Sequence, residues 1–88
     1  MDYDKLAGIL KALGHPSRLK MAEGIALYGC HVNKIVEKMG LPQSTVSQHL
    51  AALKNAGIVT YQKKGVRSCY CLTDKKFNKL LKVIRQML

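Results

Sequence analysis

The chain has 88 residues, of which 48% are hydrophobic, so it is long enough for one small folded domain spanning residues 1–88 and is not a disordered tail. Its 15 Lys and Arg against 5 Asp and Glu give a net charge of +10, which favours a polyanionic partner such as nucleic acid, although it also serves solubility. No signal peptide is visible and no apolar run approaches a membrane span, so we expect no membrane partner and a cytoplasmic location.

Two helices are predicted in the first third of the chain. The first runs from Asp2 to Leu13, with Asp2 as its N-cap and Gly14 after its end. The second begins at His15-Pro16-Ser17, where proline suits the first turn, and ends at Gly29. Because the second helix is apolar over much of its surface, we expect it at the centre of the domain.

A helix-turn-helix is predicted in the middle of the chain. A short helix from His31 to Met39 is followed by the turn Gly40-Leu41-Pro42 and then by a second helix that ends near Lys54. The buried face of this second helix is marked by apolar residues at helical spacing, namely Val46, Leu50 and Leu53. Its opposite face is polar but almost uncharged and includes Gln43, Ser44, Ser47 and Gln48.

This polar face is unusual for a helix that only faces solvent. Solvated faces commonly carry paired Glu and Lys residues, which stabilise the helix. Short hydroxyl and amide side chains contribute little to helix stability, but they can donate to and accept from base edges in a major groove. We therefore interpret the segment from Leu41 to Lys54 as a recognition helix with its preceding turn.

After Gly57 the pattern changes from helical to alternating, which predicts a β-hairpin. Strands from Ile58 to Gln62 and from Val66 to Leu72 flank a turn at Lys63-Lys64-Gly65. The tip carries basic residues suited to phosphate contacts or to an adjacent minor groove: Lys63, Lys64 and Arg67. The lysines would equally protect an exposed edge strand from aggregation.

The last helix begins after Thr73-Asp74 and continues to the C-terminus. Its apolar stripe is longer than one small core needs, so we expect a two-fold homodimer built from the first and last helices. The alternative is that both helices pack only within the monomer. The expected dimer interface consists of Leu6, Ile9, Leu10, Leu13, Phe77, Leu80, Leu81, Ile84, Met87 and Leu88. Such a dimer would read half-sites about 34 Å apart.

The three cysteines form an odd set in a chain without an export signal, which argues against a disulfide framework. Cys69 and Cys71 share one face of a strand, and we expect that face to be opposite the core and the thiols to be accessible. They could be small apolar residues, ligands of a thiophilic ion, or redox-active thiols. Their spacing is poor for a direct disulfide, so redox pairing would involve Cys30.

The order of helices and hairpin resembles the ArsR/SmtB family of winged helix-turn-helix repressors. The segments KALGHPSRLKM, PQSTVSQHLAALKNAGIV and GVRSCYCLTD carry this resemblance, which extends over nearly the whole chain. It implies a mainly α fold with a small β-hairpin as the wing, homodimeric through the terminal helices. It also implies a repressor that binds double-stranded operator DNA and leaves it when a small inducer binds. The implied DNA-contacting residues of the recognition helix are Gln43, Ser44, Thr45, Ser47, Gln48 and His49. His49 lies nearer the buried side, where helix packing or a phosphate contact suits it better than base reading.

Inducers in the family are metal or metalloid ions and, in some branches, reactive sulfur or oxidants. One family site uses Cys-x-Cys at the start of the third helix, where this chain has His31 and Asn33 with Cys30 one position earlier. A second site uses residues on the last helix, which here has no His or Glu, so we expect that site to be absent. Sensing would then involve Cys30, His31, Cys69 and Cys71, through a thiophilic metal or metalloid ion or through persulfide or disulfide chemistry.

Other classes of function are weaker. A winged-helix regulator without metal or thiol sensing and a general nucleic-acid-binding module are the alternatives within DNA binding. An enzyme is disfavoured because the chain has no Ser/His/Asp set, no Gly-rich phosphate loop and few carboxylates. An RNA-binding module is disfavoured because few aromatic residues are available to stack on bases.

Overall fold

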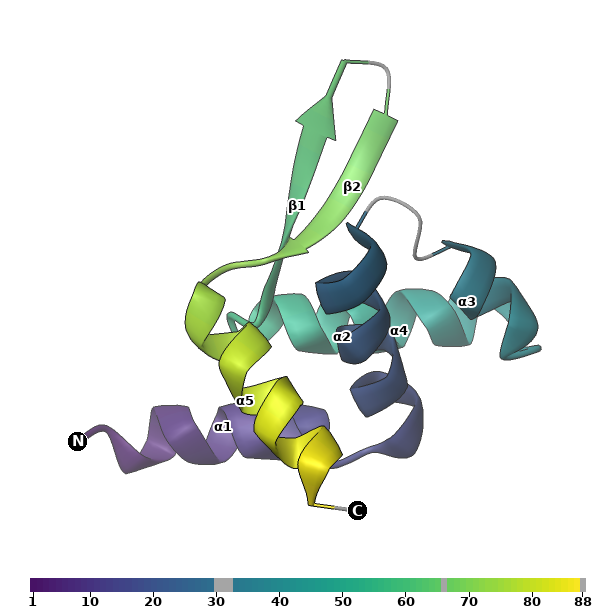
Figure 1. Ribbon diagram of the computed structural model, residues 1–88. Helices are drawn as coiled ribbons and strands as arrows, with labels where there is room; N and C mark the ends of the chain where they lie inside the picture. The colour runs from purple at the N-terminus through teal and green to yellow at the C-terminus, as the bar shows by residue number, and fades with distance from the viewer. Residues whose placement is uncertain (30–32, 66, 88) are drawn as a thin grey trace.

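The computed structural model describes residues 1–29, 33–65 and 67–87, and within the hairpin it leaves the side chains of Lys64, Arg67 and Ser68 undescribed. Figure 1 shows a helical body from which a two-stranded antiparallel hairpin projects, with α1 at the end of the body away from the hairpin and α5 running from the base of the hairpin toward α1. The elements in chain order are α1 (Tyr3–Leu13), α2 (Pro16–Tyr28), α3 (Asn33–Lys38), α4 (Gln43–Asn55), β1 (Val59–Lys64), β2 (Arg67–Leu72) and α5 (Lys75–Gln86). The expected fold class is confirmed.

The core forms around α2, which contacts α1, α3, α4, α5 and β2. This confirms the central position predicted from its broad apolar surface. The largest fully buried side chains come from four different elements and the segment before β1: Met21, Leu53, Ile58, Val59 and Leu81. None of the helices in the described ranges is long and apolar enough to cross a membrane.

Side chains cap the helices largely as expected. Asp2 and Asp74 each accept a hydrogen bond from a backbone N–H of the first turn of α1 and α5, at 3.0 and 2.9 Å. At α2, His15 acts as the N-cap, because its Nδ1 accepts from the backbone N–H of Ser17 at 3.1 Å. The residues His15-Pro16-Ser17 predict the start of α2, and the capping role of His15 is an addition from the structure.

The end of α4 is set by Gly57, which adopts φ +79°. The N–H of Gly57 donates to the carbonyl of Lys54, and the N–H of Ile58 donates to the carbonyl of Leu53, both at 3.0 Å. These two bonds define a Schellman motif, in which a left-handed residue ends the helix and satisfies its last carbonyls. The motif turns the chain so that Ile58 is fully buried beside the core face of α4.

The hairpin is longer at its tip than the sequence indicated. The strands pair from Val59 with Leu72 to Lys64 with Arg67, so Lys63 and Lys64 belong to β1 and the predicted three-residue turn is wrong. The loop contains Gly65, with φ +62°, and position 66, which lies outside the described residues. A two-residue loop with positive φ matches the right-handed twist of the strands, so the ladder can continue to the tip.

Candidate nucleic-acid interface

The two faces of α4 have the burial that its sequence pattern predicted. Val46 and Leu53 are buried and Leu50 is half-buried against the core. The polar residues Gln43, Ser44, Ser47 and Gln48 are exposed, and Thr45 is half-buried between the two faces. The N-cap of α4 is Pro42, which makes no side-chain cap, and the first turn carries no acidic residue. The start of α4 is therefore free of side chains that would repel a phosphate backbone.

His49 lies on the buried side of α4, where only 8% of its surface is exposed. The Nε–H of Arg18 on α2 donates to His49 Nδ1 at 3.1 Å, and the ring of His15 lies 4.6 Å from the ring of His49 between centroids. Burial lowers the pKa of His49 below its ordinary value, and the positive charges of His15 and Arg18 lower it further. These contacts support the packing interpretation of His49 rather than direct base reading.

The wing formed by β1 and β2 projects beyond the helical body (Figure 1). Lys63 is exposed, and Lys64 pairs with Arg67 across the last rung of the ladder. The rings of Tyr61 and Tyr70 also face each other across the ladder, edge to face with centroids 5.0 Å apart. This aromatic pair stiffens the hairpin and so supports the position of its basic tip.

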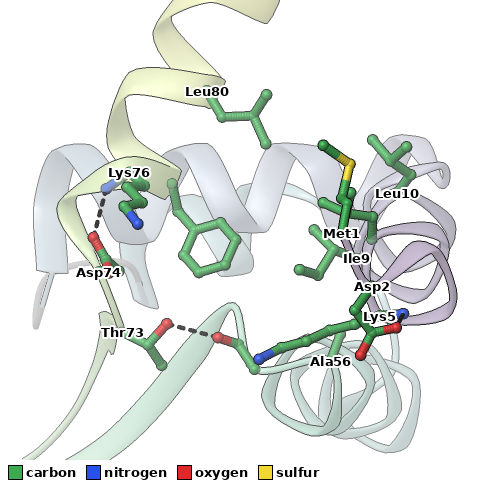
Figure 2. Close-up of a pocket in the computed structure, with 13 residues that line it drawn as sticks. Met1, Asp2, Lys5, Ile9, Leu10, Ala56, Thr73, Asp74, Lys76 and Leu80 are labelled. Atoms are coloured by element: carbon green, nitrogen blue, oxygen red, sulfur yellow. Dashed lines mark hydrogen bonds between the residues drawn. The ribbon is translucent and has the colours of Figure 1, made fainter.

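A groove of about 890 Å³ lies between α1, the end of α4 and the start of α5. Figure 2 shows Ile9, Leu10 and Leu80 around it, with Thr73 and Asp74 toward one end. Leu6 and Phe77 also line it, so five of the residues expected at a dimer interface meet in one place. The groove is mostly apolar and open, and it would need a cover to keep water away from its lining.

The expected dimer interface is only partly available. Leu13 and Leu81 are 6% and 1% exposed and belong to the core of the monomer, so placing them at the interface was wrong. Both α1 and α5 pack on α2, and Leu13 and Leu81 lie on the part of each apolar stripe that contributes to the core of the monomer. Met87 is exposed, Ile84 is half-buried, and Leu88 lies outside the described residues.

Thr73 links the start of α5 to the segment between α4 and β1, at the edge of this groove. Its hydroxyl donates to the carbonyl of Gly57 at 2.6 Å, and its N–H donates to the carbonyl of Ile58 at 3.0 Å. The start of α5 is thereby attached to the end of α4 (Figure 2). The pair Thr73-Asp74 predicts a helix start, but no local pattern predicts this contact, since its two partners are 16 positions apart.

The candidate sensing residues are not gathered into a site by the described structure. Cys69 is 3% exposed and disulfide-bonded, so the expectation that it is accessible was wrong. Its strand β2 packs on α2, which places this face of the wing inward. Cys71 is half-buried with a free thiol, and Cys30 and His31 lie outside the described residues. Within the described residues no three His, Cys, Asp or Glu side chains could together hold a metal ion.

Comparison with known proteins places these features among bacterial and archaeal regulators. The family model "Bacterial regulatory protein, arsR family" matches residues 15–61. The HTH-type transcriptional regulator MJ1325 of Methanocaldococcus jannaschii is 37% identical, over 97% of each chain. The transcriptional repressor PagR of Bacillus anthracis is 29% identical, over 96% of this chain and 85% of PagR. The homodimeric winged helix-turn-helix DNA-binding domain of Mycobacterium bovis Mb0332 superposes with a TM-score of 0.81 at 27% identity, covering 96% of this chain and 78% of that one.

Proposed function

Because the chain belongs to the ArsR family of DNA-binding transcriptional regulators, which are not enzymes, we propose that it is a homodimeric repressor reading operator DNA through α4. The observation that carries this proposal is the exposed, uncharged polar face of α4 opposite a buried apolar stripe. Its residues Gln43, Ser44, Ser47 and Gln48 supply hydroxyl and amide groups of the kind that pair with base edges.

The wing supplies the sequence-independent part of the interaction in this proposal. Lys63, Lys64 and Arg67 lie at the tip of a stiffened hairpin that follows α4 directly in the chain. Cations in this position suit phosphate oxygens and release counterions when the duplex binds. The chain's net charge of +10 would attract DNA of any sequence, while contacts from α4 would provide sequence specificity.

The groove between α1 and α5 is proposed as the contact between two copies. Its exposed apolar lining is what a small domain would cover by association. A two-fold contact would place two copies of α4 on one side of the dimer, where they could enter successive major grooves. The homodimeric Mb0332 domain, which shares the fold, supports the same assembly.

Operator binding can be tested by fluorescence anisotropy with a duplex taken from upstream of the protein's own gene and a shuffled duplex of equal composition. The double variant Ser44→Ala and Ser47→Ala should lose most of its preference for the native duplex while keeping its affinity for the shuffled one. Asn55→Ala, an exposed polar residue at the other end of α4, is the matched control and should keep the preference. Equal weakening on both duplexes would contradict base reading by this face and favour a general nucleic-acid-binding module.

For the inducer, we infer that the signal is a change in the thiol state of Cys69. The disulfide-bonded sulfur lies in β2, which packs on α2, and α2 packs on α4. Reduction by a thiol or persulfide donor would break the S–S bond, add one proton to each sulfur, and oxidise the donor. Breaking this bond would alter the packing of β2 on α2 and shift the population toward a form less suited to DNA.

The same anisotropy assay separates this inference from metal sensing. Oxidised and reduced protein should differ in operator affinity, Cys69→Ser should remove the difference, and Cys71→Ser should retain it. Identical affinities in both redox states would refute the inference. A response of the reduced protein to As(III), Cd(II) or Zn(II) that is lost in the triple variant with all three cysteines changed to serine would instead assign metal or metalloid sensing.

A further inference from the structure

The cluster of Arg18, His15 and His49 connects α2 to the recognition helix by directional contacts. We propose that Arg18 and His15 are positioning residues that fix the setting of α4, and that specific DNA binding therefore requires a neutral His49. This inference rests on the proposed function, since it assumes that the polar face of α4 reads the operator. Arg18 and His15 belong to α2 and its N-cap, and neither residue lies on the polar face of α4.

The hydrogen bond between Arg18 and His49 exists in only one protonation state. Arg18 donates through Nε–H, and an arginine guanidinium has no acceptor and does not lose its proton in proteins. His49 Nδ1 must therefore be unprotonated, which places the proton of the neutral ring on Nε2. A proton added to Nδ1 would set two N–H groups against each other at a separation of 3.1 Å, so the bond would break.

This bond has no substitute elsewhere on α4. Among the described residues, it is the one side-chain hydrogen bond from α4 to another element. The apolar side chains Val46 and Leu53 fix which face of α4 meets the core, but such contacts are not directional, so the exact setting of α4 within that orientation depends on the bond from Arg18. A rotation of α4 would move Ser47 and Gln48 together with His49, because all three belong to one rigid helix.

The surroundings of His49 all favour its neutral form. The groups that act on its charge are His15 and Arg18, both cationic when protonated, and burial opposes the charge as well. Neither α1 nor β1, which also pack on α4, contributes a group to this shift within the described chain. The pKa of His49 is therefore lowered in the folded protein, below about 6.5 for the unfolded chain.

The sign of the pH effect follows from this direction. Between the unfolded and folded pKa values of His49, the unfolded chain binds more protons than the folded one, so stability falls as pH falls. The stabilisation is fully present above about 6.5 and is lost as pH drops toward and through the lowered folded pKa.

The test compares operator and shuffled duplexes from about pH 7.5 down to the most acidic pH at which circular dichroism still shows a folded protein, at constant ionic strength. The ratio of the two affinities removes the general gain in attraction as histidines become charged. In the wild type this ratio should fall roughly fivefold at the acid end, the order expected for one net hydrogen bond. His49→Asn keeps an oxygen near Nδ1 but cannot be protonated, so its ratio should stay constant. Superimposable profiles of the two proteins would overturn the proposal.

Two further measurements keep the test sharp if His49→Asn folds poorly. In the wild type, ¹⁵N spectra should show His49 as the Nε2–H tautomer, and the opposite tautomer would overturn the proposal. His15→Asn retains a capping oxygen but removes the ring whose charge lowers the pKa of His49. The fall in specific binding at acid pH should therefore begin at a higher pH in this variant. An unchanged profile would exclude a positioning role for His15. If no duplex binds at any pH, the proposed function fails, while the tautomer still tests the Arg18 bond.

Discussion

The groove between α1 and α5 yields a quantitative prediction for the substitution Leu10→Ala. Leu10 is 59% exposed in the single chain, and full burial of a leucine is worth about 1.5–3 kcal/mol, so covering this surface contributes about 1–2 kcal/mol per copy. A two-fold interface contains each residue twice, which makes the loss about 2–4 kcal/mol per dimer. The dimer dissociation constant should therefore rise by about 30-fold to 700-fold.

Sedimentation velocity over a dilution series measures this constant. Leu27→Ala is the matched control, because Leu27 is 55% exposed at the far end of α2 and does not line the groove. Circular dichroism should show both variants folded, since neither side chain belongs to the buried core. An unchanged dissociation constant for Leu10→Ala, or equal weakening by Leu27→Ala, would refute the assignment of the groove to the dimer.

Three other substitutions address the wing and the end of α4. Lys63→Gln should reduce the slope of log affinity against log salt by about one unit on any duplex, whereas Lys82→Gln on α5 should leave it unchanged; equal effects would remove the wing from the interface. Gly57→Ala should lower the free energy of unfolding in urea by about 1–2 kcal/mol because of its φ of +79°. Gly8→Ala in α1 should not be destabilising, because an added Cβ there would meet open space. Thr73→Val should lower the free energy of unfolding by about 1 kcal/mol, and Thr73→Ser, which keeps the hydroxyl, should lower it much less. Equal losses in the two variants would show that the hydroxyl bond to Gly57 contributes nothing to stability.

Much of the fold was predictable because its signals are local. The caps at Asp2 and Asp74 and the stop at Gly57 each depend on residues within a few positions of one another. The two faces of α4 follow from the spacing of Val46, Leu50 and Leu53, which only one helical orientation satisfies. The identity of the candidate DNA-contacting face therefore needed no tertiary information.

The errors concern which neighbour covers a given face. Leu13 and Leu81 fit an interface pattern, but their direction was decided by α2, which no local pattern reveals. Cys69 was placed on an outer face because alternation in a strand distinguishes two faces without saying which one meets the helices. The bond from Arg18 to His49 joins residues 31 positions apart, so sequence alone gave no reason to pair them.

The attachment of Thr73 to Gly57 has a mechanical consequence for a dimer. At this junction α5, which would contact the second copy, is hydrogen-bonded directly to the end of α4, which would enter the major groove of the DNA. In a dimer the two copies of α4 would therefore be held at a fixed separation and a fixed angle to each other. One base pair inserted between half-sites rotates one half-site by about 35° and moves it by about 3.4 Å relative to the other. A rigid dimer could then bind both half-sites only if the duplex were distorted. Tolerance to spacing would then be set by the bending of the DNA.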